Sequence, residues 1–220
     1  MIHSILVCFN NPEQTRTRWL RDLVPGLTDT GRSHVVTCVD NSPTRAPLLE
    51  ETFGPGYLWQ GGRNLMYGPS LNLAVSRVPS DFVLYACTRH GRALDPAWVA
   101  DLLEPLFGDP KVGMTGHLLG SSSPESVARE TGCAWVADAY RFEDGVRPHV
   151  QGGVFAARTA SLLENPYPPE IPHAYTDHIV TWALLKAGYL CIDVPTVRSV
   201  WRTVVGDLRG LKYVHDEAHT

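Results

Sequence analysis

Short apolar runs alternate with segments of helical spacing along the first half of the chain. Residues 16–27 and 70–78 carry apolar side chains at intervals that predict helices. The apolar runs that predict strands are residues 5–9 (ILVCF), 34–40 (HVVTCVD), 57–64 (YLWQGGRN, a short strand and turn) and 82–86 (FVLYA). Strands that alternate with helices are typical of a doubly wound, mostly parallel sheet flanked by helices. We therefore predict an α/β fold.

The second half of the chain predicts a mixed sheet. Residues 96–107 form an amphipathic pattern, and residues 175–189 give the clearest helical pattern, closed by Gly188. The strands expected here are residues 112–120, 132–140, 149–158 and 189–197. Because neither a repeat nor a low-complexity linker divides the chain, we predict a single domain over residues 1–220. It consists of two halves, residues 1–95 and 96–200, and a polar tail, residues 201–220.

Composition narrows the class of protein. The length of 220 residues suits one domain, and a hydrophobic content of 44% is enough for a sizeable core. A net charge of −4 argues against a nucleic-acid or anionic-membrane partner. The five cysteines are scattered, without a C-x-x-C pair, so we expect neither a disulfide framework nor a cysteine zinc site. The N-terminus is too short and polar for a signal peptide or membrane span, and we expect a cytoplasmic protein.

Polar residues follow three of the predicted strands. They are Asn10 and Asn11 after the first strand, Asp40 and Asn41 after the second, and Thr88, Arg89 and His90 after the fourth. Parallel sheets bind ligands beyond the carboxyl ends of their strands, so these residues predict a binding edge. A single acid at such a position can instead cap the following turn.

Several common nucleotide and hydrolase motifs are absent from the sequence. The first strand does not continue into G-x-G-x-x-G, and neither a P-loop nor G-x-S-x-G occurs. What remains is a nucleotide site without a glycine-rich cradle.

Six segments, taken in order, resemble a family 2 glycosyltransferase of the GT-A fold. They are ILVCFNNPE, VVTCVDNSP, GGRNLMYGPSLNLAV, DFVLYACTRHGRALDPAWV, QGGVFAARTASLLE and YTDHIVTWALLKAGY, and the resemblance runs from about residue 4 to about residue 197. It implies a GT-A-type, Rossmann-like sheet in which residues 1–95 bind a nucleotide-sugar and residues 96–200 bind the acceptor. The implied reaction moves a sugar to a hydroxyl of a small molecule or glycan with inversion. The expected donor is a UDP- or dTDP-sugar.

The resemblance also assigns donor-binding residues. Phe9 would stack on the nucleobase, Asn10 would lie beside it, and Asp40 would accept hydrogen bonds from the base or ribose. Arg63 and Asn64 would lie beside the base or ribose. The plainer alternatives are a core aromatic for Phe9 and a surface residue for Arg63.

The helix at residues 175–189 carries the expected catalytic base. Asp177 stands where the family has the second acid of its Glu-Asp pair, and Thr176 replaces the first. The alternative is an acid that stabilises the helix N-terminus. Gly152 and Gly153 would let backbone amides approach the sugar or diphosphate, or would form a β-bulge. Tyr175 and Trp182 would flank the acceptor or belong to the core.

The family's metal-binding Asp-x-Asp motif is replaced here by Thr88, Arg89 and His90. Three explanations stay open. His90 could hold a metal ion, alone or with His215 of the tail, in which case Mn²⁺ or Zn²⁺ fits an imidazole better than Mg²⁺. Arg89, Arg92 or His90 could neutralise the diphosphate without a metal, which is the explanation we favour. Finally, the chain could be a scaffold that no longer catalyses.

Three other functions compete with glycosyl transfer. The chain could bind a nucleotide as an inactive partner of another transferase. It could be a sugar nucleotidyltransferase, although residues 10–13 do not form the expected glycine-rich loop. It could also be a metallohydrolase that uses His173, Asp177 and His178, a spacing that equally suits a helix start.

Overall fold

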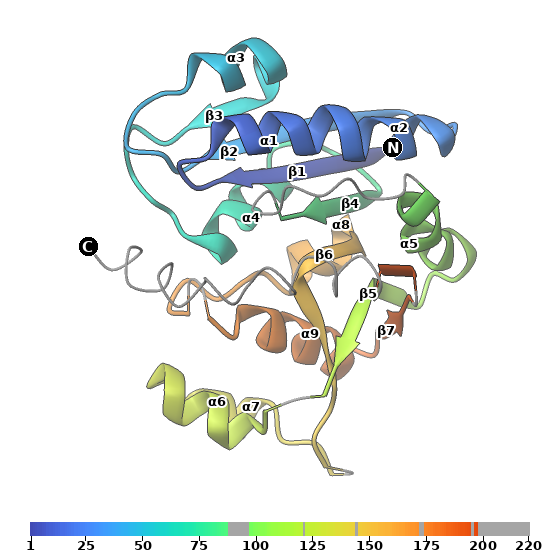
Figure 1. Ribbon diagram of the computed structural model, residues 1–220. Coiled ribbons are helices and arrows are strands. Elements are labelled where there is room, and N and C mark those ends of the chain that lie inside the picture. Colours follow the sequence, from blue (N-terminus) through green and yellow to red (C-terminus); the bar gives the residue numbers. More distant parts are fainter. Residues whose placement is uncertain (88–96, 121, 144, 172–173, 195, 198–220) are drawn as a thin grey trace.

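One seven-stranded sheet, in the order β3-β2-β1-β4-β6-β5-β7, organises the computed structural model (Figure 1). The structure describes residues 1–87, 97–120, 122–143, 145–171, 174–194 and 196–197. The α/β prediction is confirmed, because helices flank a sheet that is parallel in one part and mixed in the other.

The first half of the chain forms four parallel strands. They are β1 (Ile2–Cys8), β2 (His34–Asp40), β3 (Tyr57–Trp59) and β4 (Phe82–Ala86). Between β1 and β2 run α1 (Pro12–Thr17), the π-helical segment η1 (Arg18–Leu23) and α2 (Val24–Asp29). The later connections contain α3 (Pro47–Phe53), the 3₁₀ turn η2 (Gly54–Gly56) and α4 (Tyr67–Val75). Parallel neighbours place all four carboxyl ends at one edge of the sheet.

The second half adds three strands of mixed direction. They are β5 (Val112–Leu119), β6 (His149–Arg158) and β7 (Leu190–Asp193). β6 is antiparallel to both β4 and β5, whereas β7 is parallel to β5. The helices are α5 (Ala97–Gly108), α6 (Pro124–Thr131), α7 (Trp135–Ala139), α8 (Thr159–Glu164) and α9 (Thr176–Lys186). The reversal of β6 brings its first residues to the edge where β4 ends.

Apolar side chains fill both faces of the sheet. Side chains from η1, α2, α3 and α5 cover one face, and those from α4, α8 and α9 cover the other. A third, smaller cluster joins α6 and α7 to α9 (Figure 1). No helix in the described ranges is both long and apolar enough to cross a membrane.

The strand predicted at residues 132–140 is wrong, because this stretch contains the helix α7. Gly132 ends α6 in the left-handed conformation, with φ of 71°. The apolar residues that follow can be read as a buried strand, but Cys133, Val136, Ala137 and Tyr140 share one helical face. All four pack in the cluster with α9. A continuous apolar run hides this period, since periodicity alone does not separate a short buried strand from a helix.

Candidate functional site

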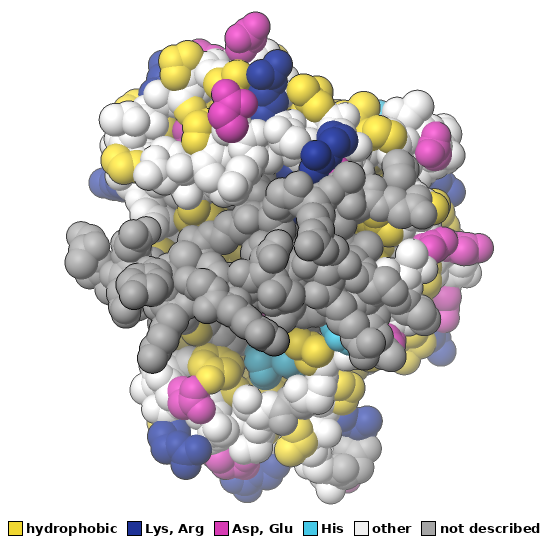
Figure 2. Space-filling model, viewed as in Figure 1, with side chains coloured by type: hydrophobic (Ala, Val, Ile, Leu, Met, Phe, Trp, Pro, Cys, Tyr) yellow, Lys and Arg dark blue, Asp and Glu magenta, His cyan; other side chains and the backbone are white. Residues whose placement is uncertain are grey.

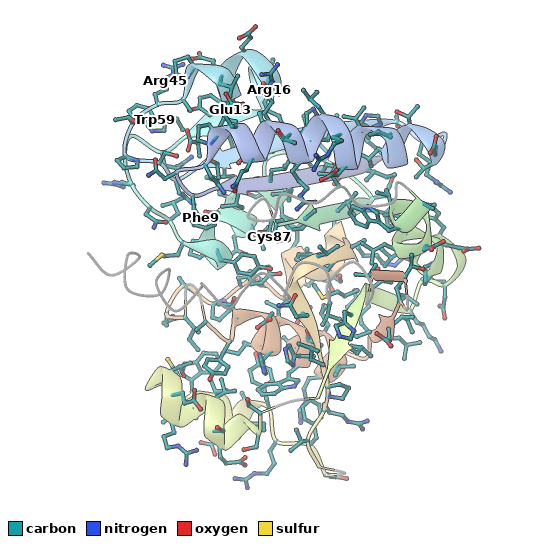
Figure 3. The ribbon with its side chains drawn as sticks, in the orientation of Figure 1. Phe9, Glu13, Arg16, Arg45, Trp59 and Cys87 are labelled. Carbon is teal, nitrogen blue, oxygen red and sulfur yellow. The ribbon has the colours of Figure 1, made fainter. Side chains whose placement is uncertain are left out.

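The ends of β1 and β2 are joined by a network of short polar contacts. Cys8 lies opposite Asp40 in the register of the two strands. After β1, the amide of Asn10, which has φ of 60°, donates to the Ser42 hydroxyl at 3.1 Å. Phe9 is partly buried and packs against the core cluster that includes α4. Figure 3 shows Phe9 just beyond β1 and Cys87 just beyond β4.

Asp40 is fully buried, and protein donors contact both of its carboxylate oxygens. The Tyr57 hydroxyl donates to Oδ2 at 2.6 Å, and the Ser42 amide donates to Oδ1 at 3.0 Å. Burial and the bond to Asp40 raise the pKa of Tyr57. Asp40 therefore holds the turn after β2 in place. Each oxygen keeps a second lone pair for a further donor, so the expected contact with a base or ribose stays a prediction.

The turn before α4 carries Arg63 and Asn64, and both are exposed. The Asn64 side chain accepts from the Met66 amide at 2.9 Å, which fixes the start of α4. Asn41 ties this turn to the β2 end, because its Oδ1 accepts from the Leu65 amide at 3.2 Å. This turn therefore lies beside the end of β2, and the roles of Arg63 and Asn64 in donor binding stay predictions.

Thr88, Arg89 and His90 lie outside the described residues, as does His173. The last described residue before them is Cys87, whose amide donates to the Gly153 carbonyl at 2.7 Å. The strand that leads to the predicted diphosphate position therefore ends beside the Gly152–Gly153 pair.

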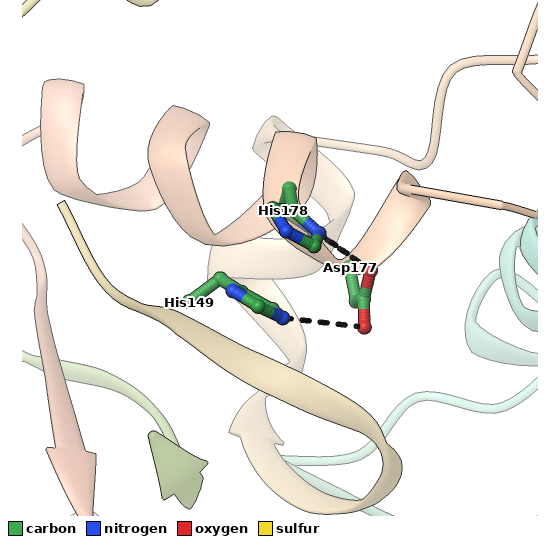
Figure 4. Close-up of side chains that lie close together, drawn as sticks. All are labelled: His149, Asp177 and His178. Carbon is green, nitrogen blue, oxygen red and sulfur yellow. Dashed lines mark hydrogen bonds and ion pairs between the residues drawn. The ribbon is translucent and has the colours of Figure 1, made fainter. Parts of the chain in front are cut away.

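Asp177 lies in the first turn of α9 and contacts Gly152 of that pair; Figure 4 shows it between His149 and His178. Its Oδ2 accepts from the Gly152 amide at 3.0 Å, and its Oδ1 accepts from the His178 amide at 3.0 Å. A Cβ on residue 152 would lie 2.9 Å from the Tyr67 hydroxyl oxygen and 3.2 Å from the Asp177 Cβ. Glycine is therefore needed for this close approach.

Both glycine amides donate within the protein. The Gly152 amide is used by Asp177, and the Gly153 amide donates to the Gln151 side chain at 2.7 Å. The carbonyl of Gly152 in turn accepts from Tyr67 at 2.8 Å. A contact between these amides and a sugar or diphosphate, which stays a prediction, would require these bonds to be exchanged.

Two histidines flank Asp177, and the sequence analysis identified only one of them. The Nδ1 of His178 is 3.1 Å from Oδ1, and the Nε2 of His149 is 3.8 Å from Oδ2 (Figure 4). The two imidazole rings stack with centroids 3.4 Å apart and planes 19° apart. The sequence did not predict His149, because the carboxyl ends of parallel strands predict the site, whereas antiparallel β6 brings its first residue there.

The electrostatics of this cluster favour a carboxylate beside a neutral ring. Burial acts to raise the pKa of Asp177, but the hydrogen bonds from His178 and from the Gly152 amide oppose it, and the pKa falls below its usual value. Burial lowers the pKa of His149 to about 4, against the opposing effect of Asp177. At neutral pH, Asp177 is therefore ionised and able to accept a proton.

The aromatic neighbours have different roles. Trp182 is fully buried, and its Nε1 donates to the Arg147 carbonyl at 3.2 Å, so it belongs to the core. Tyr175 is partly exposed, and its hydroxyl donates to Glu130. Both rings contact the His178 ring edge-on. On the face drawn in Figure 2, histidine side chains reach the surface among hydrophobic ones.

Comparison with solved structures shows a fold shared with glycosyltransferases of the GT-A type. Glucosyl-3-phosphoglycerate synthase from Mycobacterium tuberculosis, in complex with Mn²⁺, UDP-glucose and phosphoglyceric acid, is similar over 94% of this chain and 79% of its own, with 15% identity and a TM-score of 0.56. The mannosyltransferase PcManGT from Pyrobaculum calidifontis, in complex with GDP-mannose and Mn²⁺, matches over 87% of this chain and 54% of its own, with 13% identity and a TM-score of 0.54.

A third similar structure is Staphylococcus aureus TarS, residues 1–349, with 15% identity and a TM-score of 0.52. The match covers 87% of this chain and 57% of that one. No protein-family model matches the chain, and neither does any curated protein sequence. At these identities the likeness establishes the fold, and the family 2 assignment stays a prediction.

Proposed function

We propose that this chain is an inverting glycosyltransferase that moves a sugar from a nucleotide-sugar to a hydroxyl of a small molecule or glycan. The observation that carries the proposal is the position of the Asp177 carboxylate, held by Gly152 beside the end of β4 in a GT-A-type sheet. Two of the structures named above support it, because they are complexes with UDP-glucose and with GDP-mannose.

The proposed reaction is a single displacement at the anomeric carbon. The acceptor oxygen forms a bond to that carbon while the bond to the nucleoside diphosphate breaks, and the diphosphate leaves with the electron pair. Asp177 takes the acceptor's proton, which is the task of a general base. Its Oδ2 is 3.8 Å from the His149 ring nitrogen, too far for a hydrogen bond, so this oxygen has capacity for another donor.

Donor binding is proposed for the edge formed by the β1 and β2 ends. Phe9 supplies a partly exposed ring for the base, and Asn10, Arg63 and Asn64 supply polar groups around it. Asp40 contributes to donor binding by holding the turn after β2 in place. A uridine or thymidine diphosphate is the proposed nucleotide.

The residues of the predicted diphosphate position do not fit a hard divalent cation. Mg²⁺ is held through carboxylates and phosphates, and Thr88, Arg89 and His90 include no carboxylate. We therefore assign charge neutralisation of the diphosphate to Arg89, Arg92 or His90, and we derive no step through a metal ion there. His90 as a metal ligand is the alternative that the experiment below separates.

The experiment is to measure nucleoside diphosphate release from a panel of UDP-, dTDP- and GDP-sugars, in EDTA and in Mn²⁺. The assay contains candidate hydroxyl acceptors, and the Asp177→Asn variant is the control. Release in EDTA that Asp177→Asn abolishes supports the proposal. Release only with Mn²⁺, lost in His90→Ala, would assign a metal-binding role to His90. Donor binding without release points to an inactive scaffold, and pyrophosphate-dependent donor breakdown points to a nucleotidyltransferase.

A further inference from the structure

His149, Asp177 and His178 bring three ligand-type side chains to one point. One donor atom from each residue lies within 4.8 Å of the other two, although the three residues come from β6 and α9. Two imidazoles and one carboxylate match the three-ligand sites that hold zinc while leaving a coordination position open. The set suits borderline transition-metal ions better than Mg²⁺ or Ca²⁺, which prefer oxygen ligands.

The donor atoms of the cluster are within reach of a tetrahedral site. Ligand bonds of about 2.0–2.2 Å place the donor atoms of a tetrahedral zinc ion about 3.3 Å apart. Here one donor atom of each residue lies within 4.8 Å of the other two, and Nδ1 of His178 is 3.1 Å from Oδ1 of Asp177. Because the two rings are stacked face to face, they must turn out of the stack to direct both nitrogens at one ion, at the edge that faces the carboxylate (Figure 4).

Hydrogen bonding among the described residues does not explain why His149 is buried here. Within these residues its Nδ1 has no hydrogen-bond partner, and its Nε2 is 3.8 Å from Asp177, beyond hydrogen-bond distance. A metal ion at Nε2 would give this nitrogen the partner that Asp177 does not supply.

An ion can reach the cluster from solvent. The side chains of Asp177 and His178 are 20% and 11% exposed, whereas that of His149 is 5% exposed. The ion would therefore have one ligand on the sheet side and two facing outward, with its open position toward water.

We infer that His149, Asp177 and His178 form a binding site for a zinc-type divalent ion. A bound ion would occupy the carboxylate of Asp177. If Asp177 is the base of the proposed function, an ion at this site inhibits transfer, so the site would regulate the enzyme.

The test is to titrate the full chain with Zn²⁺ by calorimetry and with Co²⁺ by visible absorption, which reports imidazole ligands and coordination number. The variants His149→Gln, His178→Gln and Asp177→Asn are compared with His34→Gln, a histidine of β2 outside the cluster. The double variant His215→Gln/His219→Gln controls for the tail. Circular dichroism confirms that each variant is folded.

One ion per chain is expected, with affinity lowered at least about tenfold by each cluster variant, since even outer-shell partners of a metal contribute 10–100-fold. The two control variants should bind as the unmodified chain does. The inference is overturned if Zn²⁺ does not bind, or if only the tail variant weakens binding. Because Asp177→Asn conserves size and lies in a partly exposed position, it still tests the site should His149→Gln fail to fold.

An activity measurement separates this inference from the proposed function. If Zn²⁺ binds at the cluster without inhibiting transfer, the metal site is supported, but Asp177 is not the base. A chain without any transfer activity would overturn the proposed function, and the binding result would still decide the metal site.

Discussion

Asp40 and Asp177 lie at the same edge of one sheet, but their surroundings differ. Asp40 is fully buried, and its partners are a tyrosine hydroxyl and a backbone amide. Asp177 is partly exposed, and its side-chain neighbours are two imidazoles. The first arrangement holds a turn in place, and the second suits proton transfer. The difference teaches that the position of an acid at a strand or helix end does not define its role, whereas the chemistry of its partners does.

The largest effect is expected at Asp177. Asp177→Asn keeps the shape and an oxygen for the Gly152 amide but removes the proton acceptor. We expect turnover to fall about 10²–10⁴-fold, the usual contribution of general acid–base catalysis, while donor affinity is unchanged. Steady-state release of nucleoside diphosphate, together with calorimetric donor binding, measures both. Unchanged turnover would show that Asp177 is not the base, and its role would then not differ from that of Asp40 as proposed.

Each half of the chain contains a buried histidine with a lowered pKa, His3 and His149, and these predict that acid destabilises the fold. His3 is the simpler case. Burial lowers its pKa from 6.5 to about 4, and its Nε2 contacts the Thr37 hydroxyl at 2.8 Å. Between these two pH values the unfolded chain binds the proton and the folded chain does not. Stability therefore falls as the pH drops from about 6.5 to about 4, by on the order of 3 kcal/mol for this residue.

Urea unfolding at pH 7 and at pH 4 measures this loss of stability. His3→Gln should reduce the difference between the two pH values, and His34→Gln, at a less buried position, should leave it unchanged. Equal pH dependence in the chain and in His3→Gln would show that His3 does not carry the effect.

A smaller effect on stability sharpens the contrast at Asp40. In Asp40→Asn an NH₂ group replaces one carboxylate oxygen. If this group faces the Tyr57 hydroxyl, which already accepts from the Ala46 amide at 3.0 Å, the hydroxyl proton loses its buried acceptor. The expected cost is about 1–3 kcal/mol. Thermal and urea unfolding should show this loss for Asp40→Asn and a smaller one for Asp177→Asn, since water can reach Asp177. The reverse order would contradict the structural role of Asp40.

The smallest effect expected concerns the glycine that contacts Asp177. In Gly152→Ala the added carbon displaces Asp177 or Tyr67, and we expect turnover to fall about tenfold through loss of alignment. Gly108→Ala is a matched control, because a Cβ there meets no atom within 4 Å. Equal turnover in both variants would show that the close approach at residue 152 does not position the base.

Much of the fold could be predicted from the sequence, because strands β1, β2 and β4 are short apolar runs with helical segments between them. The start of α9 was also predictable, and so was Asp177 within it. The helix α7 was not, since its apolar stripe is embedded in a continuous apolar run. Tyr57 as the partner of Asp40 and His149 as the neighbour of Asp177 depend on the pairing of β2 with β3 and of β4 with β6. A single sequence does not record such pairings.

The most direct test of the account is a calorimetric titration of the chain with UDP, dTDP and GDP, first in EDTA and then in Mn²⁺. We expect a pyrimidine nucleoside diphosphate to bind in EDTA. We also expect Arg89→Ala to weaken this binding about 10–100-fold, which corresponds to one hydrogen bond to a charged group. Failure of all three nucleotides to bind in either buffer would contradict the proposal that this chain uses a nucleotide-sugar.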